Sequence, residues 1–206
     1  MMFFAHMVIG LIAGFILYEV YHDQNVIIFC AIGSVLPDIV DKPLGLIVLK
    51  SVLDASRIYF HSLVILFLFL LTGLFVWRYY HSNSFLCVAL GIFLHQILDF
   101  MWNSPDRWFY PFLGPYQVEE HDNYFFRVLV SELSSPTEWV FLLAILVILL
   151  GAGISWYQKR PVIVPDPLRE RQQHRLYSGL LGVAIFVLFL SLAIIFLWQP
   201  YQTVLI

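Results

Sequence analysis

The sequence predicts an all-α fold: a polytopic transmembrane helical bundle of about six membrane helices with one short interfacial helix. Of its 206 residues, 61% are hydrophobic and 12% are charged, whereas an ordinary soluble domain is about 25% charged. Several apolar runs approach the length of about 20 residues that spans a bilayer. They lack the alternating polarity of a transmembrane barrel, and helices satisfy their own backbone in lipid. We expect one integral membrane domain over residues 1–206.

Apolar runs separated by polar turns place the expected elements along the chain. The predicted spans are residues 3–20, 25–36, 58–79, 85–102, 138–157 and 176–198. The second span should end before Pro37, which makes it about 18 Å long, so whether it crosses fully stays open. Residues 44–53 should form the interfacial helix. The start, "MMFFAHMVIG", has no basic n-region, so the first segment is interpreted as retained rather than cleaved.

The distribution of charge predicts how the helices are oriented. Residues 159–175 are rich in Lys and Arg, so the positive-inside rule places them in the cytoplasm. The acidic stretch 103–137 suits the outside, and alternation then puts both termini and Asp38 outside. A re-entrant second span would instead flip the first helix. The expected location is the cell membrane, as a multi-pass protein.

Membrane lipids are the expected partners. Nucleic acid is not expected, because the basic residues form no soluble patch with interleaved aromatics. Cys30 and Cys87 both fall in apolar helices and are interpreted as packing residues rather than a disulfide.

Ionisable side chains gather at the predicted outer ends of the spans. They are His6, Asp38, Asp41, His61, His95, Asp99 and Glu138. Such groups cost several kcal/mol in a membrane unless they are paired or functional. His95 and Asp99 are four residues apart and share a helix face. A mixture of His and Asp suits a hydrolytic divalent metal such as zinc or manganese.

Each of these residues also has a simpler interpretation. His6 suits a hydrogen-bonded packing histidine, Asp38 suits a turn cap, and Glu138 suits a charge near a helix N-terminus. Asp41 could pair with Lys42 or Arg57. The same residues could line the path of a transporter or ion-conducting protein, or hold a non-catalytic, metal-stabilised scaffold. The apolar inner halves of the helices, such as "VILFLFLLTGLFV", count against a path.

The motifs occur in an order that resembles a known family. His6, "LPDIVDKPLG", "HSL" at His61, and "HQILDFMW" followed by "SP" and "PFLGP" resemble the YdjM-type membrane-bound metal-dependent hydrolases, the LexA-binding, inner membrane-associated family. The resemblance covers about residues 1–116. Many members have their second acid where this chain has Val40, and the acid here is Asp41. Phe60 stands where the family usually has Thr.

The motifs and the resemblance together lead to one main hypothesis. We expect a membrane-embedded metal-dependent hydrolase acting on a phosphoester or ester, with a lipid or amphiphilic substrate, on the extracytoplasmic side. The resemblance extends distantly to zinc-dependent phospholipases C, which implies phosphoester chemistry. Zinc is the expected cofactor, with manganese as the alternative. The expected metal ligands are His6, Asp38, His61, His95 and Asp99. Glu138 and Asp41 are the expected catalytic residues, with Asp41 alternatively a ligand or a residue behind the ligands.

Overall fold

The structure is a computed structural model that describes residues 3–48, 57, 59–113 and 124–158. The described part is helical and contains no strand, so the all-α class is confirmed there. The chain divides into two compact units, Met1–Ser134 and Ser135–Ile206, which are described separately. The predicted span 176–198 and the basic segment 159–175 lie outside the described residues.

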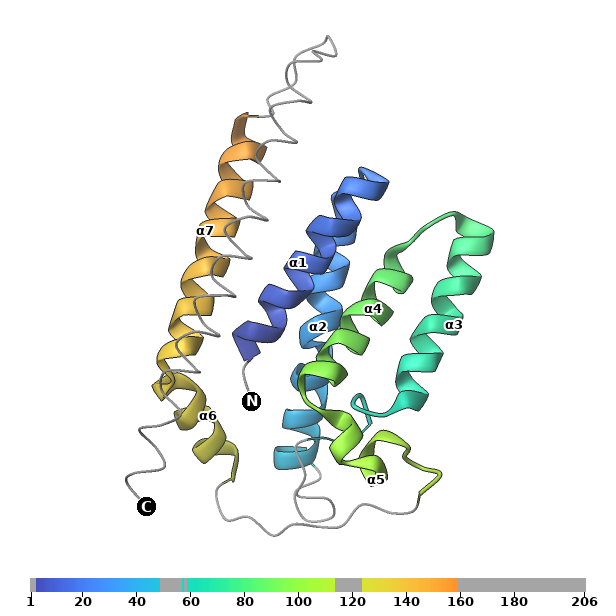
Figure 1. The fold of residues 1–206 in the computed structure, drawn as a ribbon, viewed down its shortest axis with the longest axis vertical. Coiled ribbons are helices and arrows are strands. Elements are labelled where there is room, and N and C mark those ends of the chain that lie inside the picture. The colour runs from blue at the N-terminus through green and yellow to red at the C-terminus, as the bar shows by residue number, and fades with distance from the viewer. Residues whose placement is uncertain (1–2, 49–56, 58, 114–123, 159–206) are drawn as a thin grey trace. The chain divides into compact units, whose positions relative to one another are not determined.

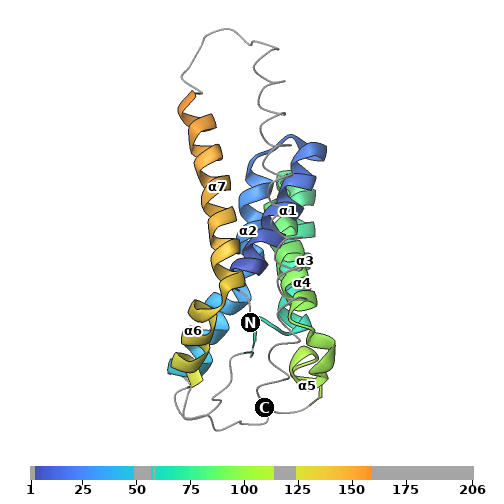
Figure 2. The ribbon, with the colours of Figure 1, turned by 60° about the vertical axis from the view of Figure 1, so that its left-hand side comes forward.

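Two helical hairpins build the first unit. α1 (Phe3–Tyr21) returns through α2 (Asn25–Pro43), and α3 (Leu63–Tyr80) returns through α4 (Ser84–Leu98). The hairpins meet where α2 packs against α4, and α1 also contacts α4 (Figure 1). Figure 2 shows the same helices after a 60° turn. α2 therefore lies at the centre of the unit, with neighbours on both sides.

Glycines allow the backbones of α2 and α4 to touch. A Cβ on Gly33 would collide with the backbone carbonyl of Val88, and one on Gly91 would lie 2.5 Å from the carbonyl oxygen of Cys30. Small residues permit this kind of close approach between membrane helices. Cys30 and Cys87 are buried as free thiols beside this crossing. The contact fixes the position of α2 relative to α4 and thereby the residues that follow on both helices.

The predicted end of the second helix was wrong. α2 continues through the buried Pro37 as far as Pro43 and then passes into a π-helical turn, Leu44–Val48. Proline lacks the N–H for one helical hydrogen bond, but packed neighbours allow membrane helices to tolerate that loss. Asp38 and Asp41 consequently lie on the helix rather than in a turn after it. Of the interfacial helix predicted over 44–53, only 44–48 lie within the described residues.

The helices of the second hairpin, in contrast, are shorter than predicted at the end that carries His61 and Asp99. α3 begins at Leu63, with Ser62 as its N-cap accepting from the Ile65 N–H. His61 is therefore in the turn before the helix instead of one turn inside it. α4 ends at Leu98 with Asp99 as its C-cap, and Phe100 takes a left-handed φ of 52° that ends the helix.

Short helices follow α4, over the end of the predicted span 85–102 and in the acidic stretch 103–137. They are η2 (Met101–Asn103), α5 (Pro105–Trp108) and α6 (Tyr124–Ser134). In the second unit, α7 (Pro136–Gln158) contains the whole of the predicted span 138–157.

Two of the described helices, α1 and α3, are long and apolar enough to cross a membrane. α4 and residues Pro136–Gly151 of α7 are shorter apolar helices. The described residues therefore show two candidate membrane helices, and the predicted number of about six spans stays a prediction. α3 leaves most of its large apolar side chains exposed, including Phe67, Leu71 and Phe75. Leaving each such side chain in water costs about 1.5–3 kcal/mol relative to burying it. This surface is therefore suited to lipid.

The α2–α4 crossing generates the first prediction. Gly33→Ala places a methyl group against the Val88 carbonyl, which is backbone and cannot rotate away, so the folded state should lose about 1–3 kcal/mol. Gly153→Ala is the matched control, because a Cβ there meets no atom within 4 Å. Thermal unfolding in detergent should show a lower Tm for the first variant only. Equal Tm values would contradict the tight crossing.

Candidate metal centre

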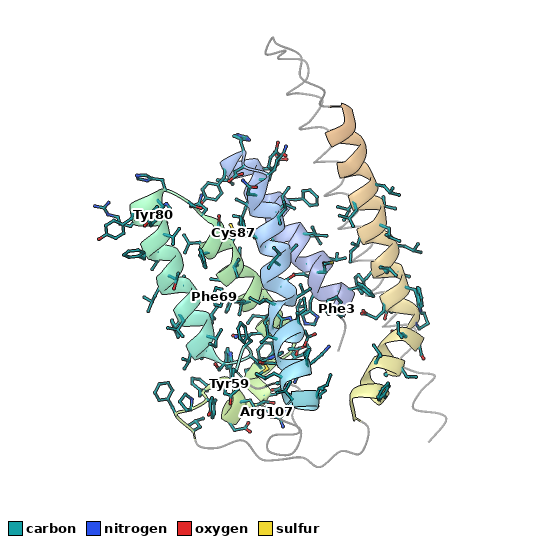
Figure 3. The ribbon with its side chains drawn as sticks, turned by 180° about the vertical axis from the view of Figure 1, so that it is seen from behind. Phe3, Tyr59, Phe69, Tyr80, Cys87 and Arg107 are labelled. Atoms are coloured by element: carbon teal, nitrogen blue, oxygen red, sulfur yellow. The ribbon has the colours of Figure 1, made fainter. Side chains whose placement is uncertain are left out.

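Four buried side chains from three parts of the first unit converge on one point. Asp38 comes from α2, His61 from the turn before α3, and His95 and Asp99 from the end of α4. Each offers one oxygen or nitrogen, and these atoms all lie within 4.8 Å of one another. The group could hold a divalent metal ion. Figure 3 labels Tyr59 at this end of the hairpins and Tyr80 at the opposite end.

Hydrogen bonds determine which nitrogen of each histidine faces the group. His95 Nδ1 lies 2.7 Å from the backbone carbonyl oxygen of Ser34. A carbonyl only accepts, so Nδ1 carries the proton and Nε2 presents a lone pair. His61 Nδ1 lies 2.7 Å from Asp41 Oδ2 and donates to that carboxylate. Its Nε2 is therefore also directed into the group.

The two Nε2 atoms face each other at 3.1 Å. Two lone pairs at this distance repel, so a proton or a metal cation must lie between them. Asp38 Oδ1 lies 3.7 Å from His61 Nε2 and 3.9 Å from His95 Nε2, and no described group donates a hydrogen bond to it. One proton could satisfy only the contact between the imidazoles, whereas a metal ion would contact all four side chains. The donor set thus fits a divalent cation.

Asp41 holds the turn that carries His61. Its Oδ1 accepts from the backbone N–H groups of Tyr59 and Phe60 at 3.3 and 3.1 Å, and its Oδ2 accepts from that of His61 at 3.2 Å. With the imidazole added, one fully buried carboxylate fixes both the backbone and the ring of His61. Asp41 is therefore not among the four converging residues but stands directly behind one of them.

The remaining charged neighbours contact the two converging carboxylates. Lys42 Nζ lies 2.9 Å from Asp38 Oδ2, and Arg57 Nε lies 2.9 Å from Asp99 Oδ2. His6 Nε2 lies 3.3 Å from Asp99 Oδ1, and its ring packs on that of His95 with centroids 4.2 Å apart. His6 thus contacts a member of the group from behind rather than belonging to the four.

Gln96 links α4 to the turn before α3. It is fully buried, and its Nε2 donates to the backbone carbonyl of Ser62 at 3.2 Å. Its Oε1 accepts from the indole N–H of Trp108 at 3.0 Å. Gln96 was not singled out from the sequence, although an amide next to His95 in an apolar helix was a usable signal. The carbonyl of Ser34 had no sequence signal, because every residue has a backbone carbonyl.

Glu138 lies in the first turn of α7, in the second unit, and is buried. It is not one of the converging residues of the first unit, and its role as a base stays a prediction. The suggested partners of Asp41 also need correction. Arg57 contacts Asp99, Lys42 contacts Asp38, and Asp41 binds His61.

Comparison with known protein families gives a match over nearly the whole chain. A family model described as YdjM inner membrane protein matches residues 1–202. The chain belongs to the YdjM inner membrane protein family. No curated protein and no solved structure matches it. Membership confirms the resemblance seen in the motifs and identifies an inner membrane protein.

The position of Asp41 in this YdjM-family protein generates the second prediction. Asp41→Asn weakens the hold on His61 without removing any of the four converging atoms, so metal affinity should fall about 10–100-fold. Asp38→Asn should lower it further, because a converging carboxylate is lost. Asp23→Asn is the control, since the Asp23 carboxylate accepts from the Asn25 N–H at the far end of α2. Competition with a zinc-binding dye would measure the affinities. Unchanged affinity in Asp41→Asn would contradict the positioning role.

Proposed function

We propose that this YdjM-family protein is a membrane-embedded, zinc-dependent hydrolase whose ion is held by Asp38, His61, His95 and Asp99. The observation that carries the proposal is the pair of facing imidazole nitrogens 3.1 Å apart, flanked by two buried carboxylates. Zinc bonds to nitrogen and oxygen are about 2.0–2.2 Å long, so tetrahedral ligand atoms lie about 3.3–3.6 Å apart. The separations that involve the two nitrogens span 3.1–3.9 Å, close to that spacing.

The chemistry of the ion and the roles of the residues follow from this arrangement. A divalent ion supplies Lewis-acid chemistry, because it polarises a phosphoryl or carbonyl oxygen and makes water a stronger nucleophile. Asp41 orients the imidazole of His61, and the Ser34 carbonyl orients that of His95. His6 holds the outer oxygen of Asp99.

The surroundings of the site support an amphiphilic substrate. The site lies at the ends of apolar helices, and exposed apolar side chains follow directly after Asp99. They are Phe100, Trp102, Phe109, Phe112 and Leu113. Aromatic side chains of this kind are enriched where a membrane meets water. We therefore propose a multi-pass arrangement with the site at the extracytoplasmic boundary, where a lipid-like phosphoester or ester reaches it from the bilayer.

Metal content provides the direct test of the proposed centre. Wild-type protein purified in detergent should contain about one zinc per chain, and His95→Asn should contain almost none, because one nitrogen ligand is gone. His81→Asn is the matched control. His81 caps the C-terminal end of α3 in a left-handed conformation that Asn also tolerates. Elemental analysis measures all three proteins. Full zinc occupancy in His95→Asn would exclude this centre.

Hydrolysis separates a catalytic ion from one that only stabilises the fold. A chromogenic phosphoester should be hydrolysed by the zinc-loaded wild type and by His81→Asn, and at background rate by His95→Asn. If zinc is present at full occupancy and chelation lowers Tm, yet neither a phosphoester nor an ester panel is turned over, the ion serves a scaffold and the hydrolase proposal is wrong.

Labelling from outside the cell tests the proposed orientation. In a variant without Cys30 and Cys87, Asn103→Cys lies at the site end and Tyr80→Cys lies at the opposite end of α3. A membrane-impermeant maleimide should label Asn103→Cys in intact spheroplasts and Tyr80→Cys only after lysis. The reverse pattern would place the site on the cytoplasmic side.

A further inference from the structure

We propose that Arg57 binds an anionic phosphoryl group of the substrate, which makes the substrate a phosphoester rather than a neutral carboxylic ester. The inference rests on the proposed zinc centre and deepens it by naming the substrate class. It comes from three features of the first unit: the distance of the guanidinium from the converging ligands, its partial exposure, and the balance of charge around the site.

Arg57 is separated from the proposed ion by a single carboxylate oxygen. Its Nε lies 2.9 Å from Asp99 Oδ2, and that oxygen lies 3.6 Å from His61 Nε2 and 3.9 Å from His95 Nε2. A group bound to the ion would therefore also be within reach of the guanidinium. In the same way, Lys42 contacts Asp38 on another side of the ligand set.

The guanidinium has donors to spare. Arginine offers five N–H donors in a fixed fork, and Nε supplies only one of them. Among the described residues, no hydrogen bond from its terminal amino groups is found. The Arg57 side chain is 23% exposed, whereas those of Asp99 and Asp38 are 4% and 1% exposed. Arg57 therefore lies at the accessible rim of the site, and its fork suits the geometry of phosphate oxygens.

The charge balance favours an anion as the incoming ligand. Among the described residues around the site, three buried carboxylates, Asp38, Asp41 and Asp99, face the cations Lys42 and Arg57. With neutral imidazoles, a bound divalent ion leaves an excess of one positive charge. An unbalanced charge away from water is costly, and a phosphoryl group would offset it. A neutral ester would leave the excess in place.

Phosphate binding to the whole protein tests this inference without relying on turnover. Full-length protein is loaded with zinc in detergent, and inorganic phosphate is titrated by calorimetry. Arg57→Gln should keep its zinc and bind phosphate at least about 10-fold more weakly than wild type, because a charge-assisted fork is lost. Arg57→Lys keeps the charge but not the fork and should fall between the two. Arg78→Gln is the matched control, since Arg78 lies in the last turn of α3.

A second titration identifies where the phosphoryl group comes from. A short-chain phosphatidic acid that binds the wild type more tightly than inorganic phosphate would indicate a lipid headgroup, and equal binding would indicate a soluble phosphoester. Loss of binding in Arg57→Gln supports the anion site with either ligand.

The outcomes separate this inference from the proposed function. Wild type that binds no zinc would overturn the proposed function and this inference with it. Zinc-loaded Arg57→Gln that binds phosphate as tightly as wild type would overturn this inference alone. Loss of zinc from Arg57→Gln would also overturn it, because the residue would then hold Asp99 in place rather than a substrate.

Discussion

Three positions on one face of α2 control the whole site. Ser34 accepts from the imidazole of His95, Asp38 is one of the converging carboxylates, and Asp41 fixes the imidazole of His61. Their spacing of four and three residues keeps them on one face of a helix. Because both Nδ1 atoms are held by acceptors on this helix, both Nε2 atoms are forced towards the same point. The proposed metal centre is thus largely a property of α2 and of what packs against it.

The close contact between α2 and α4 allows this geometry to form. Without side chains at Gly33 and Gly91, the helices approach until backbone atoms touch, and a carbonyl of α2 comes within hydrogen-bond distance of a histidine on α4. A larger residue at either glycine would separate the Ser34 carbonyl from the ring that it orients. The glycines at the contact of α2 with α4 therefore determine both how the apolar parts of the hairpins pack and how the site residues are oriented.

The polar end also shows how a largely apolar chain contains so many charges. Asp38, Asp41 and Asp99 each have at least one cationic, imidazole or backbone N–H neighbour, and the fully buried amide of Gln96 bonds at both its nitrogen and its oxygen. Burial of such groups is tolerated only when they are paired. The proposed ion and the proposed phosphoryl ligand extend the same rule to the facing lone pairs and to the exposed part of Arg57.

The sequence by itself determined the helical class, the family and the residues worth examining, because composition and motif order depend only on residue type. It placed His95 and Asp99 on one helix face from their spacing alone. It could not show that α2 continues through Pro37, because whether a proline ends a helix depends on the neighbours that pack around it. For that reason Asp38 and Asp41 were expected after the helix, and the common face of residues 34, 38 and 41 was not recognised.

Only the tertiary structure decided which nitrogen of each histidine faces inwards, that His6 stands behind Asp99, and that Arg57 reaches the same carboxylate. These facts depend on residues far apart in the chain meeting across the contact of α2 with α4. Distances of this kind are set by packing, which no local pattern of residues encodes.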